Sequence, residues 1–384
     1  MVRQMNAGPL YKQIYDYIIE QVKNGELEAG DRIPSEKELA EHFQVSRITS
    51  KKALDLLSQH SIIHRIQGKG SFLSKQEFLS PQPAHEFVEP KQGHLLGIIF
   101  PDLGDSYGSG IVRAIEAQCN QSGSHLMIKL SHGSSTIEEL AISQLIEIGV
   151  EGLIVFPVSG RHYNPKILEL VVKNYPLVLV DRYLRDIPAS SVCTHNRAAA
   201  TAATNYLFSL GHERIGFISR RPEGTSAIEE RMQGFHMAYA QKAIQLDPQL
   251  FLTTIAEDDL DASIGAIQDF IVSNADVTAF IACEYGVALI LQYALEAVGK
   301  SIPQDYAVIC FDSPPCVLGK PFFTHIRQNE VGIGEKAMDL LLLQLGGNTA
   351  PQNTLVDFTL VEGQSTRANK LTASQYSQIP FSGQ

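Results

Sequence analysis

Apolar segments of strand length alternate with segments of helical periodicity along most of this 384-residue chain. The predicted strands cover 95–100, 125–130, 152–156 and 177–181, and then 215–218, 251–255, 279–283 and 307–311. The predicted helices cover 111–121, 137–148 and 165–174, and then 197–210, 228–240, 261–273 and 286–298. Strands that are apolar throughout and separated by helices are typical of parallel sheets covered on both faces. Because the pattern runs twice, and a helix 331–345 and a strand 354–361 follow, we expect an α/β body of two doubly wound lobes.

A helix-turn-helix pattern occupies residues 32–56. Ser35 is a typical helix N-cap, and Glu38 three residues later completes a capping box. After a turn at 44–45, Ser46 caps a second helix, which opens with the polar or cationic residues Arg47, Thr49, Ser50, Lys51 and Lys52. Such side chains, with the free N–H groups of a helix N-terminus, suit contacts to base edges and phosphates in a major groove.

Two short strands extend this pattern into a winged helix-turn-helix. A helix over 9–24 precedes the pair, and segments 62–66 and 71–73 flank a cationic, glycine-rich turn at 67–70. We expect the tip of this hairpin to enter or follow a DNA groove. The Gly68-Lys69-Gly70 turn lacks the third glycine and the following helix of a dinucleotide-binding loop, which disfavours a nucleotide site.

The charge is divided unevenly along the chain. The whole chain has a formal net charge of −11, yet residues 1–75 contain 11 Lys/Arg against 9 Asp/Glu. Within 46–75 there are 6 basic residues against one acidic residue. A local basic surface on an acidic body is the pattern of a DNA-binding module joined to a domain that does not touch DNA.

Residues 9–74 resemble the DNA-binding domain of the GntR family. The resemblance lies in the segments 10–14, 30–40, 45–47, 52–54 and 68–72, which read LYKQI, GDRIPSEKELA, VSR, KAL and GKGSF. It implies base and phosphate contacts from the first helix, the recognition helix and the wing. The full predicted DNA-binding set is Ser35, Lys37, Ser46, Arg47, Thr49, Lys51, Gln67, Gly68 and Lys69.

The body, about 94–368, resembles the effector domain of the LacI/GalR family, which shares its fold with periplasmic sugar-binding proteins. The resemblance lies in the segments 97–102, 152–154, 180–182, 210–218, 230–235, 302–305 and 311–312, of which LGHERIGFI at 210–218 is the most specific. The combination resembles the arabinose-regulator-like branch of GntR proteins. We therefore expect a DNA-binding domain at 1–74, a proline-containing linker at 75–93, a two-lobed effector and dimerisation domain at 94–370, and a disordered tail at 371–384.

Polar side chains follow the predicted strands and should meet in one cleft, because ligands of such sheets bind beyond the carboxyl ends of the strands. The predicted effector-binding set is Asp105, Tyr107, Asp181, Arg182, Arg231, Glu284, Asp312 and Gln328. Carboxylates and a guanidinium can bond vicinal hydroxyls, and Tyr107 can stack on a sugar face. The resemblance implies sugar contacts from Asp181, Arg231, Glu284, Asp312 and Gln328. Relatives usually have Asn-Asp where this chain has Glu284-Tyr285.

Several other classes of site are disfavoured by the sequence. The acidic run 257–261 lacks the spacing and the glycine of an EF-hand, so no metal and no cofactor is expected. The five cysteines are scattered and form no C-x-x-C, which favours reduced thiols in the cytoplasm. No apolar run reaches the roughly 18 residues of a membrane helix. No nucleophile elbow or H-x-x-x-H pair is present, so an enzyme is disfavoured.

These observations predict a cytoplasmic, sequence-specific transcriptional regulator, most simply a homodimeric repressor on a pseudo-palindromic operator. A small sugar in the cleft would release it from DNA. Two alternatives stay open at this point. One is a regulator that needs a corepressor such as a purine, and the other is an α/β enzyme with the first domain as an adaptor.

Overall fold

The computed structural model describes residues 10–59, 62–66, 70–74, 93–160, 162–256 and 258–369. The chain divides into two compact units, Met1–Glu89 and Pro90–Gln384. Apart from Gly93, the predicted linker 75–93 lies outside the described residues, and so does the predicted tail 371–384.

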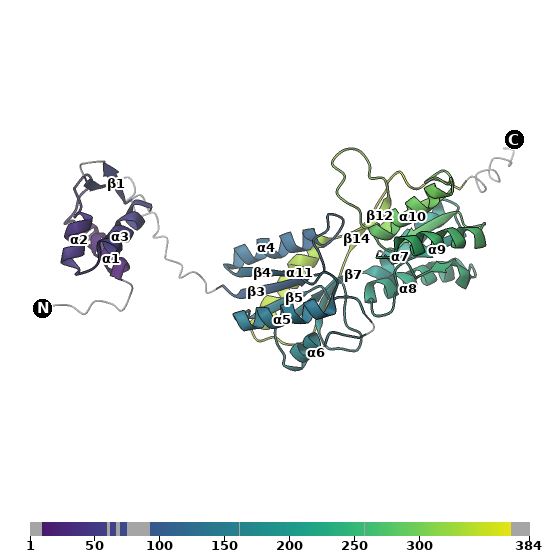
Figure 1. The fold of residues 1–384 in the computed structure, drawn as a ribbon, viewed down its shortest axis with the longest axis horizontal. Coiled ribbons are helices and arrows are strands. Elements are labelled where there is room, and N and C mark those ends of the chain that lie inside the picture. The colour runs from purple at the N-terminus through teal and green to yellow at the C-terminus, as the bar shows by residue number, and fades with distance from the viewer. Residues whose placement is uncertain are drawn as a thin grey trace, which may run out of the picture. The chain divides into compact units, whose positions relative to one another are not determined.

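The first unit is a winged helix-turn-helix (Figure 1). Its helices are α1 (Leu10–Lys23), α2 (Glu36–His42) and α3 (Arg47–Gln59), and its antiparallel hairpin is β1 (Ile63–Ile66) and β2 (Gly70–Leu73). The capping box at Ser35 and Glu38 is confirmed, because each side chain bonds the backbone N–H of the other. Ile14, Leu54 and Leu73 belong to one buried cluster that joins the helices to the hairpin.

The N-terminal lobe of the second unit is a six-stranded parallel sheet in the order β13-β7-β6-β5-β3-β4. Its strands are β3 (Leu95–Phe100), β4 (His125–Leu130), β5 (Gly152–Val155), β6 (Leu177–Val180), β7 (Ser190–Thr194) and β13 (Asn353–Val356). Its helices are α4 (Ser109–Ser122), α5 (Ser135–Ile148), α6 (Pro165–Val172) and α11 (Glu330–Leu345). Ile98 packs on the α4 and α11 side and Ile99 on the α5 and α6 side, so both faces of the sheet are covered.

The C-terminal lobe repeats this order as β14-β12-β11-β10-β8-β9. Its strands are β8 (Ile215–Ile218), β9 (Phe251–Leu252), β10 (Ala279–Ala282), β11 (Ala307–Phe311), β12 (Thr324–Gln328) and β14 (Phe358–Val361), and only β14 runs antiparallel to its neighbour. Its helices are α7 (Asn196–Ser209), α8 (Ser226–Gln241), α9 (Leu260–Ser273) and α10 (Tyr285–Ala297), with a short 3-10 helix at Pro248–Leu250.

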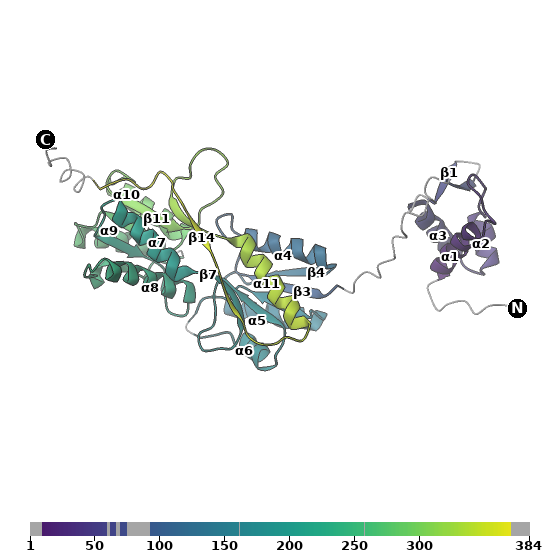
Figure 2. The same cartoon turned by 180° about the vertical axis from the view of Figure 1, so that it is seen from behind.

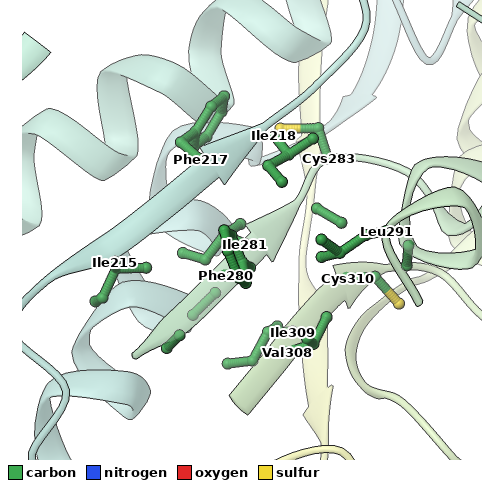
Figure 3. Close-up of a cluster of buried hydrophobic side chains, with 14 of the residues drawn as sticks. Ile215, Phe217, Ile218, Phe280, Ile281, Cys283, Leu291, Val308, Ile309 and Cys310 are labelled. Atoms are coloured by element: carbon green, nitrogen blue, oxygen red, sulfur yellow. The ribbon is translucent and has the colours of Figure 1, made fainter. Parts of the chain in front are cut away.

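A hydrophobic core lies between the C-terminal sheet and its helices. Figure 3 shows Phe217 on β8, Phe280 on β10, Ile309 on β11 and Leu291 on α10, which all belong to one buried hydrophobic cluster. Gly216 allows this packing, because a Cβ there would come within 2.6 Å of the Phe280 ring. The strands are apolar on both faces because helices cover both sides of the sheet, as the alternation of apolar strands and helices along the sequence predicts.

The chain passes between the lobes three times, from β7 to α7, from β12 to α11 and from β13 to β14. Figure 2 shows that the late helix α11 lies beside α4 in the N-terminal lobe, although α11 follows β12 of the C-terminal lobe in the chain. The prediction of one strand over 354–361 is wrong, because the structure has two short strands there, β13 and β14. No glycine or proline marks the break at Asp357, but β13 pairs with β7 and β14 pairs with β12, in different sheets.

Strands β7 and β12 were not predicted, because they are largely buried although they contain several polar residues. Ser190, at the start of β7, accepts a hydrogen bond of 2.9 Å from Gln344 Nε2. Thr324, at the start of β12, shares one of 2.7 Å with Thr366. These partners allow polar side chains in a sheet interior, which a search for apolar runs does not detect. The predicted strand 251–255 is also shortened, to Phe251–Leu252.

Candidate functional site

A cationic groove of about 440 Å³ opens between α2, α3 and the hairpin of the first unit. Of the predicted DNA-binding residues, Ser35, Lys37 and Arg47 line it. Arg32 and Arg65 line it as well, although neither belongs to the predicted DNA-binding set. Lys51 is exposed on α3 outside the groove. Gln67, Gly68 and Lys69 lie outside the described residues, so their predicted role stays a prediction.

The N-terminus of α3 is held by its own hydroxyl groups. Ser46 Oγ accepts the Thr49 N–H at 3.3 Å and lies 2.9 Å from Thr49 Oγ1. Ser50, grouped above with the DNA-facing residues, is fully buried instead and donates to the Glu36 carbonyl at 2.7 Å. The helical period turns Ser50 inward, where its hydroxyl ties α3 to α2.

A cleft of about 560 Å³ lies between the two lobes of the second unit. Its walls come from the carboxyl ends of β3, β4, β5 and β6 in one lobe and of β8, β10, β11 and β12 in the other. Of the predicted effector-binding residues, Tyr107, Asp181, Arg182, Arg231, Glu284, Asp312 and Gln328 line it. Asp105 is exposed and does not belong to the described residues of the cleft wall, although Gly104 and Ser106 do.

On the N-terminal side, Asp181 is the central acceptor. Tyr107 donates its hydroxyl to Asp181 Oδ1 at 2.8 Å, and Arg182 Nε lies 3.3 Å from Asp181 Oδ2. The Arg182 guanidinium also donates to the Pro157 carbonyl and lies 4.9 Å from the centre of the Phe156 ring. Burial raises the pKa of Tyr107 well above its usual range, and the nearby Asp181 and Asp312 raise it further, so this phenol is a donor at neutral pH.

On the C-terminal side, Asp312 holds the corresponding place. It accepts a hydrogen bond of 2.7 Å from Gln328 Nε2, whereas Gln328 Oε1 is buried without a protein partner among the described residues. Arg231 lies 3.9 Å from the centre of the Phe311 ring and donates to Asn196 Oδ1 at 2.8 Å. Burial raises the pKa of Asp312 to about 7, although Arg231 and Gln328 act to lower it. The cleft therefore offers both hydrogen-bond donors and acceptors, from side chains that are themselves largely buried.

Glu284 is bonded by Arg220, which is not in the predicted effector-binding set. Arg220 Nε donates to Glu284 Oε2 at 2.5 Å, and Arg220 Nη2 donates to Glu284 Oε1. Arg220 follows β8 by two residues and lines the cleft. The rule that ligands bind beyond strand ends could have identified it.

The lobes also touch outside the cleft. The Tyr183 N–H donates to Ser226 Oγ at 3.0 Å and the Tyr183 hydroxyl to Glu230 Oε1 at 3.2 Å. Arg185 pairs with Glu229 at 2.5 Å. These residues of the N-terminal lobe follow Asp181 and Arg182, and their partners are on the first turns of α8. We call this set of contacts the rim clasp.

Two further findings concern the described residues. They contain no group of three or more His, Cys, Asp or Glu side chains placed to hold a metal ion. None of their helices is long and apolar enough to cross a membrane.

Comparisons with known proteins match both units. Residues 10–73 match the bacterial regulatory proteins of the gntR family, and residues 204–366 match the periplasmic binding protein-like domain. The chain is 25% identical to the arabinose metabolism transcriptional repressor of Geobacillus stearothermophilus, over 87% of this chain and 90% of that protein. It is 27% identical to the transcriptional repressor CytR of Escherichia coli K12, over 86% and 96% of the two chains.

Solved structures share the fold of the body. The transcription regulator CcpA of Lactococcus lactis superposes with a TM-score of 0.63 at 22% identity, covering 72% of this chain and all of that one. A LacI family regulator from Enterococcus faecium with bound ribose superposes with a TM-score of 0.60 at 23% identity, with the same coverage. This chain therefore joins a helix-turn-helix domain of the gntR family to a periplasmic-binding-protein-like domain.

Proposed function

We propose that this protein is a transcriptional repressor that binds operator DNA through its first unit and leaves it when a small sugar fills the interlobe cleft. The observation that carries the proposal is that one chain combines two features. The first unit has a cationic groove beside the recognition helix α3, and the second unit has a polar cleft lined by both of its lobes. The arabinose and CytR repressors, similar over nearly the whole chain, support the same combination.

The cleft chemistry suits a polyol. Asp181 and Asp312 provide acceptors from opposite walls, and Arg231 and Gln328 provide donors. The orphaned Gln328 Oε1 calls for one more donor, which a ligand hydroxyl would supply. The ribose bound to the Enterococcus faecium regulator of the same fold is in keeping with a sugar.

We propose that the protein works in the cytoplasm as a homodimer. One short recognition helix reaches base edges with only about three or four side chains, so two copies on a pseudo-palindromic operator are needed for useful specificity. A ligand can change DNA affinity only if it binds one arrangement of the lobes more tightly than another. We infer that lobe closure on the sugar changes the spacing of the two winged helices.

The test is a binding selection for operator DNA, followed by gel-shift titration with L-arabinose, D-ribose, D-glucose, D-galactose and a purine nucleoside. We expect nanomolar binding to the selected site and loss of binding with one of the sugars. A ligand that tightens DNA binding would show that the protein needs a corepressor. Failure to bind any selected DNA at low salt would refute the proposal.

A further inference from the structure

We propose that Glu284 is a built-in anion that reserves the cleft for uncharged ligands and excludes sugar phosphates and sugar acids. The inference rests on the proposed function, since it concerns what the same cleft accepts. It starts from the position of the ion pair between Arg220 and Glu284.

This pair lies where an anionic ligand would otherwise bind. Arg220 follows β8 and Glu284 follows β10, two adjacent strands whose connections leave to opposite sides of the sheet. Such a switch point is the usual binding crevice of a doubly wound sheet. Glu284 is also the N-cap residue of the 13-residue helix α10, although its side chain makes no capping hydrogen bond. Helix N-termini attract phosphates and carboxylates, and here the chain supplies the carboxylate itself.

Both oxygens of Glu284 are bonded to Arg220, so the paired donors of this guanidinium are held by a carboxylate of the same cleft wall. The other two arginines of the cleft are engaged in part, each through some of its N–H groups. Arg231 donates to Asn196 and to the Cys283 carbonyl. Arg182 donates to the Pro157 carbonyl and Ser159, beside Asp181.

An incoming phosphate would therefore have to compete with Glu284 for the paired donors of Arg220. It would also face the lining acids Asp102, Asp181 and Glu284, which offset the charge of the three lining arginines, and Asp312, whose raised pKa of about 7 leaves it partly ionised near neutral pH. Neutral hydroxyls avoid this repulsion and can still bond the remaining lone pairs, including Gln328 Oε1. Removing the charge of Glu284 should convert the same wall into an anion site, because Arg220 and the α10 N-terminus would both face an empty position.

Calorimetry of the full-length protein tests this, with D-ribose against D-ribose 5-phosphate, D-glucose against D-glucose 6-phosphate, and inorganic phosphate alone. The wild type should bind neither phosphorylated sugar nor phosphate measurably. Glu284→Gln should gain affinity for inorganic phosphate by roughly ten- to a hundredfold. The double variant Arg220→Gln/Glu284→Gln should lose that gain, because the guanidinium is needed for it.

Glu147→Gln is the matched control, since it removes one acidic charge from an exposed position on α5. It should leave phosphate binding at the wild-type level. The inference is overturned if the wild type binds a sugar phosphate more tightly than its parent sugar, or if a folded Glu284→Gln gains no phosphate affinity. The wild-type comparison needs no variant, so it decides the matter even if Glu284→Gln is unstable. Operator binding is measured separately, so failure of the repressor proposal would be seen as lost DNA binding, whatever the phosphate result.

Discussion

Asp181 and Asp312 occupy equivalent positions on opposite walls of the cleft. Each follows the corresponding strand of its lobe, β6 or β11, and each has a left-handed backbone, with φ of 66° and 63°. The Asp181 N–H donates to the Val192 carbonyl and the Asp312 N–H to the Ile326 carbonyl, at 3.0 and 2.9 Å, on the next strand of each sheet. Asp and Asn adopt this conformation more readily than other L-residues, so the same turn aims a carboxylate into the cleft from each side.

Asp312 should make the stability of the second unit depend on pH. Its pKa is raised from 3.8 to about 7, chiefly by burial, so the native protein holds this proton more tightly than the unfolded chain. The resulting stabilisation is complete below about pH 4 and is lost as the pH rises toward 7, by on the order of 4 kcal/mol at most. Asp312→Asn keeps the backbone preference and removes the titration.

Melting temperatures of the wild type and Asp312→Asn between pH 4 and pH 8 provide the measurement. The advantage of the wild type over the variant should shrink as the pH rises and level off above about pH 7. A constant difference over this range would mean that Asp312 titrates in the native protein as it does in the unfolded chain.

Arg47 and Asp312 should separate the two binding activities. Arg47→Ala removes an exposed cation from the N-terminus of α3 and should weaken operator binding by about 1–3 kcal/mol, leaving sugar affinity unchanged. Asp312→Ala should abolish the sugar response while operator binding persists. Gel-shift titration of both variants with and without sugar measures this, and parallel losses in both assays would argue against separate sites.

The sequence predicts those strands of this protein whose residue types are set by a single requirement, burial of both faces. Strands covered on both faces must be apolar throughout, so β3, β5, β8, β10 and β11 are recognisable. Their ends then locate Asp181 and Asp312 in one cleft. By contrast, β7 and β12 contain Ser190, Ser191 and Thr324, whose hydrogen-bond partners come from distant segments. The break between β13 and β14 depends on which sheet each half pairs with, which is tertiary information.

Side-chain pairing within the cleft was equally hidden. Tyr107 was expected to stack on a sugar, and the structure adds its hydrogen bond to Asp181 across 74 residues of sequence. The sequence predicts that Glu284 faces a ligand. It does not show that Glu284 pairs with Arg220, which is 64 residues away in the chain. Local spacing can place each residue at a strand end and cannot say which two strand ends are adjacent.

Ser50 should support the reading helix through packing and not through contact with DNA. Its buried hydroxyl donates to the carbonyls of Glu36 and Arg47, at 2.7 and 3.1 Å. Ser50→Ala should lower the free energy of unfolding of the first unit by about 1 kcal/mol and leave sugar binding unchanged. Chemical unfolding together with gel shifts distinguishes the two roles. Reduced DNA affinity at unchanged stability would instead place Ser50 at the DNA.

The rim clasp should set how much sugar is needed for release. Tyr183 and Arg185 do not belong to the cleft wall but bond Ser226, Glu230 and Glu229 across the lobes. They therefore stabilise the lobe arrangement of this structure before any ligand arrives, and a ligand that prefers this arrangement gains affinity. Tyr183→Phe removes one of these bonds and should weaken sugar binding about two- to tenfold.

Arg185→Ala should have a smaller effect that fades with added salt, because the Arg185 side chain is 53% exposed and its ion pair is screened. Tyr293→Phe, at an exposed position on α10, is the control for loss of a phenol hydroxyl and should bind sugar normally. Calorimetric titration at low and high salt gives all three affinities. If Tyr183→Phe bound sugar with the wild-type affinity, the contacts to the ligand alone would hold the lobes together, and the rim clasp would not affect how much sugar is needed for release.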